Sequence, residues 1–205
     1  MKVLMVNGSS KTKGCTFTAL EEIGKELRKN QVEYEIIQLG GKPVMDCIAC
    51  NQCKGRGCIF QENGVPEFLE KAKEADGFVF GSPVYFAHPS GRLLSFLDRV
   101  FYSCEKNHIY VPFAGKPGVA VVSARRGGTT ASLDAINKYF SIASMPIVSS
   151  TYWNMVHGSC PEDVLKDEEG LQTMRNIAKN MIWMMKKLKE GKPELESEYQ
   201  TNFIH

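Results

Sequence analysis

The sequence predicts an α/β protein with a parallel sheet covered by helices on both faces. Short apolar runs alternate along the chain with longer segments that repeat apolar residues at helical spacing. The first run, Lys2 to Asn7, is bounded by Gly8, as expected of a strand buried on both faces. Strands that alternate with helices in this way form a parallel sheet.

The predicted elements are five strands and five helices that succeed one another in order. The strands are expected at residues 2–7, 32–39, 77–81, 118–122 and 145–149, and the helices at residues 15–30, 65–75, 89–104, 129–140 and 171–188. The last helix carries an apolar stripe that suits core packing. Residues 1–190 are therefore expected to form a single domain, followed by a polar tail at residues 191–205.

A loop rich in glycine and hydroxyl groups follows the first strand. Gly8 to Thr16 reads Gly-Ser-Ser-Lys-Thr-Lys-Gly-Cys-Thr and leads directly into the first helix. Free N–H groups and the positive end of a helix favour a phosphate at such a position. The alternative is an ordinary strand-to-helix turn that binds nothing, although most such turns are shorter.

Spacing excludes three other kinds of phosphate site. A Walker loop needs a lysine after its second glycine and four residues between the glycines, whereas Cys15 follows Gly14 and five residues separate Gly14 from Gly8. The dinucleotide fingerprint with three spaced glycines is absent. A phosphatase built on Cys15 would need an arginine six positions later, where Glu21 stands.

The ends of the third and fourth strands carry ligand-type residues as well. Five strands in the order 2-1-3-4-5 place a ligand at the carboxyl ends near strands 1 and 3. The third strand leads into Ser-Pro-Val-Tyr-Phe at residues 82–86, which offers flat apolar surface to a ring system. The fourth leads into Arg-Arg-Gly-Gly at residues 125–128, where glycine allows close backbone approach and arginine offsets negative charge.

These loops resemble the flavin-contacting segments of the NADPH-dependent FMN reductase and iron–sulfur flavoprotein branch of the flavodoxin-like superfamily, over about residues 2–190. The family loop reads roughly Gly-Ser-Pro-Arg-x-x-Gly-Asn-Thr, and Ser10, Lys11 and Cys15 replace its Pro, Arg and Asn. The resemblance implies a flavodoxin-like three-layer sandwich, bound FMN, and homodimers or homotetramers. The predicted cofactor-binding residues are Ser9, Ser10, Lys11, Gly14, Cys15, Thr16, Ser82, Pro83, Val84, Tyr85, Phe86, Ala124, Arg125, Arg126, Gly127 and Gly128.

Four cysteines lie within twelve residues, between the second strand and the next helix. Cys47, Cys50, Cys53 and Cys58 have the spacing Cys-x2-Cys-x2-Cys-x4-Cys. Three cysteines at this spacing can wrap one face of a [4Fe–4S] cluster, as in ferredoxins, and Cys58 can complete the set. Free or redox-active thiols and a zinc site are the alternatives, although zinc usually prefers two separated Cys-x2-Cys pairs.

Composition limits the partners and the compartment. The net charge of +2 gives no electrostatic reason to expect nucleic acid or an anionic membrane as a partner. No apolar stretch is long enough to span a membrane, and the first apolar run is too short for a signal peptide. Seven cysteines, an odd number, are unlike a secreted disulfide framework, so we expect a cytoplasmic protein.

The sequence thus predicts an FMN-dependent oxidoreductase that passes electrons from NAD(P)H, as a transient donor, or from a reduced protein to a flavin, quinone or other small acceptor. The cofactor carries such chemistry, so no catalytic side chain is predicted. The alternative is an electron carrier that relays electrons between protein partners through FMN and a [4Fe–4S] cluster. A third possibility is a redox sensor that uses its cysteines alone.

Overall fold

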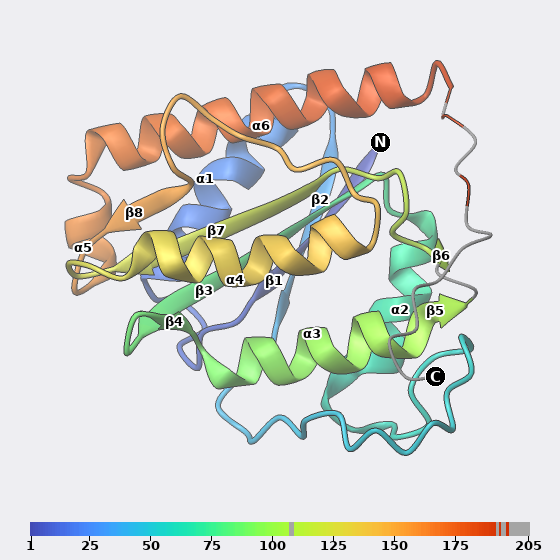
Figure 1. Cartoon of the computed structure of the whole chain (residues 1–205). Coiled ribbons are helices and arrows are strands. Elements are labelled where there is room, and N and C mark those ends of the chain that lie inside the picture. The colour runs from blue at the N-terminus through green and yellow to red at the C-terminus, as the bar shows by residue number, and fades with distance from the viewer. Residues whose placement is uncertain (107–108, 192, 194–195, 197–205) are drawn as a thin grey trace.

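The computed structural model describes residues 1–106, 109–191, 193 and 196 (Figure 1). The strands are β1 (Lys2–Asn7), β2 (Glu33–Gln38), β3 (Gly77–Tyr85), β4 (His88–Pro89), β5 (Glu105–Lys106), β6 (Ile109–Tyr110), β7 (Gly118–Ala124) and β8 (Met155–His157). The helices are α1 (Cys15–Lys29), the short 3-10 helix η1 (Glu62–Gly64), α2 (Val65–Glu74), α3 (Gly91–Cys104), α4 (Thr129–Ile142), α5 (Pro161–Val164) and α6 (Glu168–Leu188). The predicted tail lies outside the described residues, apart from residues 191, 193 and 196.

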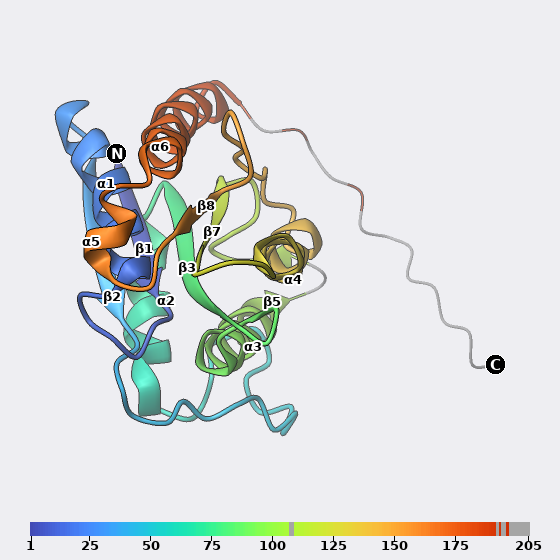
Figure 2. The same cartoon turned by 90° about the vertical axis from the view of Figure 1, so that its left-hand side faces the viewer.

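Five parallel strands form the main sheet in the order β2-β1-β3-β7-β8, and β4 pairs antiparallel with the end of β3. This confirms the predicted order of the first four strands, with a fifth strand beside the fourth. Helices α1 and α6 cover one face of the sheet, and α2, α3 and α4 cover the other (Figure 2). In the described part of the chain, no helix is both long and apolar enough to cross a membrane.

The apolar strands divide their side chains between two cores. Along β1, Val3 and Met5 pack with α1 and α6, whereas Leu4 and Val6 pack with the helices of the opposite face. This alternation is the two-residue period of a strand that is buried on both sides. All four side chains are fully buried, so β1 forms the centre of the fold and fixes where the loop after it begins.

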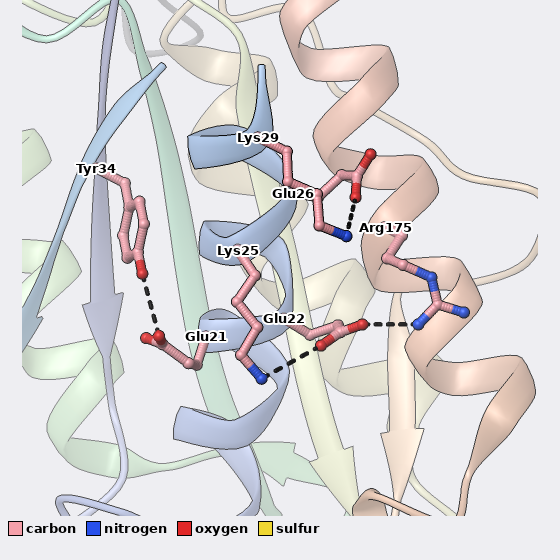
Figure 3. A network of polar contacts seen from close by, with 7 residues as sticks. All are labelled: Glu21, Glu22, Lys25, Glu26, Lys29, Tyr34 and Arg175. Atoms are coloured by element: carbon pink, nitrogen blue, oxygen red, sulfur yellow. Dashed lines mark hydrogen bonds and ion pairs between the residues drawn. The ribbon is translucent and has the colours of Figure 1, made fainter. Parts of the chain in front are cut away.

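Polar contacts join α1 to its neighbours on the outside of the molecule (Figure 3). Arg175 of α6 donates from Nη1 to Glu22 of α1 at 2.7 Å, and the hydroxyl of Tyr34 in β2 donates to Glu21 at 3.1 Å. Partly exposed pairs of this kind contribute little to stability. The apolar face of α1 holds the helix against the sheet, so the N-terminus of α1 is rigidly placed at the sheet edge.

The predicted fifth strand was wrong. Residues 145–149 form only an isolated bridge between Ile147 and Gly118, and the fifth strand of the sheet is β8 instead. Pro146 has no N–H group and cannot donate to a ladder of hydrogen bonds. Its carbonyl accepts from Gly118 N at 2.9 Å, which leaves this segment beside the start of β7 as a short extended stretch.

The third strand is longer than predicted and ends in a hairpin. β3 continues to Tyr85, turns through Phe86 and Ala87, and returns as β4, so α3 begins at Gly91 rather than at Pro89. Phe86 and Ala87 both have positive φ, at 50° and 61°, as a tight hairpin requires. The remaining helices and parallel strands differ from the prediction by three residues or fewer at each end.

Candidate functional site

Three strand ends and the N-terminus of α1 surround one cleft. The carboxyl ends of β1, β3 and β7 meet at the same edge of the sheet because these strands are parallel neighbours (Figure 1). The cleft holds about 690 Å³ of space outside the atoms, part of it open to solvent. The enclosed volume of the cleft is about 280 Å³, close to the lower end of the range for small-molecule and cofactor sites.

Nine of the sixteen predicted cofactor residues line this cleft: Ser9, Lys11, Cys15, Thr16, Pro83, Val84, Tyr85, Ala124 and Arg125. The other seven belong to the same loops but are not part of the lining: Ser10, Gly14, Ser82, Phe86, Arg126, Gly127 and Gly128. Ser123, Gly158 and Ser159 also line the cleft and were not predicted. Ser123 could have been predicted from the sequence, because it places a hydroxyl group within an apolar strand. Residues 158–159 follow β8, which was not predicted.

A buried side-chain amide holds the start of the glycine loop in place. Asn7 is fully buried, and its Oδ1 accepts from Ser9 N at 3.1 Å. Its Nδ2 donates to Gln38 Oε1 at 2.5 Å, and Gln38 Nε2 in turn donates to the carbonyl of Ser9 at 2.7 Å. These bonds join the ends of β1 and β2 and hold the start of the loop in one conformation.

The first turn of α1 faces the cleft with unused donors. Gly14 is the N-cap and supplies no side-chain hydrogen bond, so the first N–H groups of the helix have no partner from a cap. Thr16 is buried, and its hydroxyl lies 2.8 Å from that of Ser123 at the end of β7. With Ser9, which is also buried, these hydroxyls converge beside the helix N-terminus, which is the arrangement that binds a phosphate.

Gly8 and Ser82 do not line the cleft, but backbone packing and hydrogen bonds explain why these residues stand there. A Cβ at Gly8 would lie 2.8 Å from the carbonyl oxygen of Gly81, so glycine is required where the loop leaves the sheet. Ser82 accepts from Ser90 N at 2.8 Å, and Ser90 Oγ donates to the carbonyl of Gly8 at 2.7 Å. Ser82 therefore supports the loop by anchoring the N-terminus of α3 against it.

The β3–β4 hairpin forms an aromatic wall of the cleft with only one of its two aromatic residues. Tyr85 lines the cleft and is half exposed, whereas Phe86 stands at the tip of the hairpin and is fully exposed. Gly128 has a φ of 94°, and a Cβ there would lie 2.6 Å from Cα of Ala87. This glycine lets the loop before α4 pack directly against the hairpin, so it shapes the wall without lining it.

The two adjacent arginines have different positions. Arg125 and Arg126 are both exposed, but only Arg125 lines the cleft. An arginine beside a flavin ring would favour its reduced, anionic form. Of the two arginines, Arg125 is therefore the one placed to act on a ring bound in the cleft, and Arg126 serves as the comparison.

Cys15 enters the cleft as a neutral thiol. Its Sγ lies 3.7 Å from the carbonyl oxygen of Gly158, to which it donates. Burial raises the pKa of the Cys15 thiol above its usual value. A thiol held in its protonated form is a poor nucleophile, so Cys15 serves as a wall and a weak donor rather than as a reacting group.

All four clustered cysteines line a second cavity, which the residues of the loop and one side of α3 enclose. The space outside the atoms is about 330 Å³ when open solvent is included, and the enclosed volume is about 20 Å³, room for one water molecule. Among the described residues, no three histidine, cysteine, aspartate or glutamate side chains are arranged so that they could hold a metal ion. The four thiols therefore lie around the walls of a shared space rather than around a single point.

The C-terminal half of α3 anchors the cysteine loop. Gly57 N donates to the carbonyl of Ser103 at 3.0 Å, and the hydroxyl of Tyr102 donates to Asn51 Oδ1 at 2.6 Å. Lys54 and Asn51 have positive φ, at 46° and 56°, which turns the chain tightly between the cysteines. The cysteine loop thus packs on the C-terminal half of α3. The N-terminal end of the same helix contacts the glycine loop beside the cleft.

Arg99 is a buried cation in the wall of the cysteine cavity, and sequence reasoning missed it. Its side chain is 1% exposed, and its Nε has no hydrogen-bond partner. Its burial could have been predicted from the helix sequence, because the arginine follows Phe96 by three residues and precedes Val100 on the apolar stripe. Lys54 and Arg56, the cations of the loop itself, are exposed.

The remaining cysteines lie outside the four-cysteine cavity. Burial raises the pKa of the Cys104 thiol to about 12, so Cys104 is a neutral packing residue at the end of α3. Cys160 is the N-cap of the short helix α5 and lies away from the cysteine loop. All seven cysteines are free thiols.

Comparison with known proteins places this architecture in a family. The NADPH-dependent FMN reductase family matches residues 1–159. An iron–sulfur flavoprotein of Methanocaldococcus jannaschii is 34% identical over 197 residues, with 93% of this chain and 100% of the relative covered. An iron–sulfur flavoprotein of Methanosarcina thermophila is 23% identical over 195 residues, which cover 94% of this chain and 99% of the relative.

Solved structures support the fold. RosB, solved with bound 8-demethyl-8-formylriboflavin-5'-phosphate, superposes with a TM-score of 0.74 at 14% identity, covering 93% of this chain and 81% of RosB. A flavodoxin from the domain Archaea superposes with a TM-score of 0.58 at 17% identity, covering 92% of this chain and 99% of the flavodoxin. The chain therefore belongs to the NADPH-dependent FMN reductase family and is a redox flavoprotein with a flavodoxin-like fold.

Proposed function

We propose that this chain is an FMN-dependent oxidoreductase that passes electrons from NAD(P)H or a reduced protein donor to a flavin, quinone or other small acceptor. The observation that carries the proposal is the composition of the cleft. Hydroxyl groups and helix N–H groups gather at one side, and the apolar Pro83, Val84 and Tyr85 stand at the other. A phosphate needs the first kind of surface and an isoalloxazine ring needs the second.

Each part of the cleft then has a defined task. Ser9, Thr16 and the first N–H groups of α1 would hold the phosphate of FMN, and Ser123 would complete this set of donors. Tyr85 would pack against the ring and exclude water from one side of it. When bound, FMN supplies both hydride and single-electron chemistry, so no side chain has to act as an acid or a base.

A [4Fe–4S] cluster is the second cofactor that we propose, held by Cys47, Cys50, Cys53 and Cys58. Four thiols of one loop line one cavity, and thiolates are the ligands of such clusters. A zinc ion would need all four sulfurs about 2.3 Å from one point, which would require the loop to contract. The names of the relatives give independent support, because each of those described above is an iron–sulfur flavoprotein.

The cluster opens the alternative function of an electron carrier between protein partners. Helix α3 separates the two sites, since its N-cap Ser90 contacts the glycine loop whereas Arg99, Tyr102 and Ser103 line the cysteine cavity. At 1.5 Å per residue, this separation is roughly 14–20 Å along the helix. We expect the cluster to exchange electrons with the flavin of its own chain or with that of a neighbouring subunit.

Homodimers or homotetramers fit this geometry. Several large apolar side chains near the cysteine loop are exposed, among them Tyr102 and Ile142, which line a further cavity together with Cys47. A contiguous apolar surface of this kind marks interfaces between proteins. We also propose a reducing, cytoplasmic location, because all seven cysteines are free thiols.

Turnover with small molecules separates the two functions. Protein purified without oxygen and loaded with FMN is mixed with NADH or NADPH, and oxidation of the nucleotide is followed with added quinone or free FMN. An oxidoreductase consumes nucleotide over many turnovers. A dedicated carrier reduces its own cofactors once and then stops until a protein acceptor is added, which would replace the first proposal with the second.

Arg125 is expected to raise the reduction potential of bound FMN. Because this side chain lines the cleft, Arg125→Ala should lower the midpoint potential by on the order of 20–30 mV, the equivalent of about 1 kcal/mol for two electrons. Arg126→Ala removes the same charge one residue further from the cleft and is the matched control. Potentiometry that finds equal shifts in the two variants would assign the effect to general surface charge.

A further inference from the structure

Arg99 is the most deeply buried charge near either site. It lies on α3 between the apolar residues Phe96 and Val100, and it is the largest of the fully buried side chains. Burying a cation without an anion is costly, and most proteins avoid it. A buried arginine in the wall of a cavity therefore indicates that a negatively charged partner binds there.

The described residues supply no such partner. Arg99 Nη1 donates to the amide oxygen of Asn63 at 3.1 Å, and Nη2 donates to the carbonyl of Phe60 at 2.7 Å. Both acceptors are neutral, and Nε has none. Asp98 bonds to Tyr139 instead, and among the ion pairs of the described residues none includes Arg99 or Asp46, the carboxylate that lines the same cavity.

We propose that Arg99 is the positioning residue that balances the charge of the group held by the four cysteines. The inference rests on the proposed [4Fe–4S] cluster, which carries a net negative charge together with its four thiolates. Arg99 lines the same cavity and carries a fixed positive charge, and its Nε–H has no hydrogen-bond partner. Hydrogen bonds to cluster sulfurs and local charge are two of the levers that set the potentials of iron–sulfur clusters.

The two bonds of the guanidinium to the backbone and to Asn63 give this charge its position. They fix two arms of the fork against residues 60 and 63, just beyond Cys58. Lys54 and Arg56 are exposed, so solvent and salt screen their charges strongly. A buried, oriented cation should therefore outweigh both loop cations in its effect on the cluster.

The test compares potentials of reconstituted variants. Arg99→Gln removes the charge, Arg99→Lys keeps the charge but loses the fork of donors, and Arg56→Gln removes the same charge from the exposed part of the loop. After anaerobic reconstitution with iron and sulfide, the cluster potential is measured by redox titration followed by electron paramagnetic resonance. We expect Arg99→Gln to lower the equilibrium constant for one-electron reduction about tenfold, which is about 59 mV.

Arg99→Lys should restore part of that loss, and Arg56→Gln should shift the potential by much less. Protein labelled with ¹⁵N only in the guanidinium groups of arginine, both as wild type and as Arg56→Gln, provides a second measurement that needs no change at Arg99. In the reduced, paramagnetic state, pulsed electron paramagnetic resonance should detect weak coupling between the cluster and an arginine nitrogen. Unchanged potentials, or no nitrogen coupling in the wild type, would overturn the role of Arg99 while leaving the cluster in place.

The failure of the cluster itself gives a different result. If wild-type protein binds no iron after reconstitution, both the cluster and the role of Arg99 fall together. If the Arg99 variants bind iron poorly or fail to fold, the nitrogen coupling in the wild type decides. The iron content, the potential and the nitrogen coupling thus separate the two proposals.

Discussion

Replacing Ser9 by Ala and Thr16 by Val in the same chain is expected to weaken FMN binding by roughly 100-fold or more. Both hydroxyls are buried at the N-terminus of α1 and line the cleft. Each hydrogen bond to a charged phosphate is worth about 1.5–3 kcal/mol, so the loss of two exceeds 3 kcal/mol. The measurement is titration of FMN into protein from which the flavin has been removed, followed by fluorescence quenching.

The chain offers a matched control for this experiment. Ser10→Ala with Thr18→Val removes the same two chemical groups from the same loop and helix turn. Ser10 is exposed and not part of the cleft lining, and Thr18 Oγ1 bonds to the carbonyl of Gly14 at 3.2 Å. The control should bind FMN as tightly as the wild type. Equal affinity in all three proteins would place the phosphate elsewhere, and equal thermal unfolding of the flavin-free forms would exclude damage to the fold.

The sequence was sufficient for the parts of the site that local chemistry determines. The run from Val3 to Val6 is apolar and buried at every position, and only glycine fits at Gly8, where the backbones of two strand ends almost touch. Five strands alternating with helices fit the order 2-1-3-4-5, and that order places the glycine loop beside the end of β3. Pattern and topology together were therefore enough to find one side of the cleft.

The parts that were missed depend on contacts between distant segments. β8 has only three residues, so it was outweighed by the apolar run at 145–149, in which Pro146 cannot donate. Gly158 and Ser159 were lost from the predicted site with it. Phe86 and Tyr85 are neighbours of the same chemical type, and only the turn at Phe86 decides that one faces the cleft and the other faces solvent. Arg99 required knowledge of which loop covers its helix.

Replacing Cys53 by Ser is expected to abolish formation of a stable [4Fe–4S] cluster. Serine preserves the size of the side chain but removes a thiolate ligand, and Cys104 is a neutral thiol buried in the core that does not line the cavity. Wild-type protein reconstituted with iron and sulfide should hold about four iron atoms per chain and absorb broadly near ~400 nm beyond the flavin bands. The variant should lose most of both signals, whereas FMN binding in the separate cleft should be unaffected.

Cys160→Ser is the control, because this cysteine has the same chemistry but caps a short helix away from the cysteine loop. It should retain the iron content and the absorption of the wild type. One zinc and no iron per chain in the wild type would indicate a mononuclear site, and four titratable thiols with neither metal would indicate free cysteines. In both of those cases the chain would be a reductase that uses FMN alone, and the cavity beside α3 would need another explanation for the buried charge of Arg99.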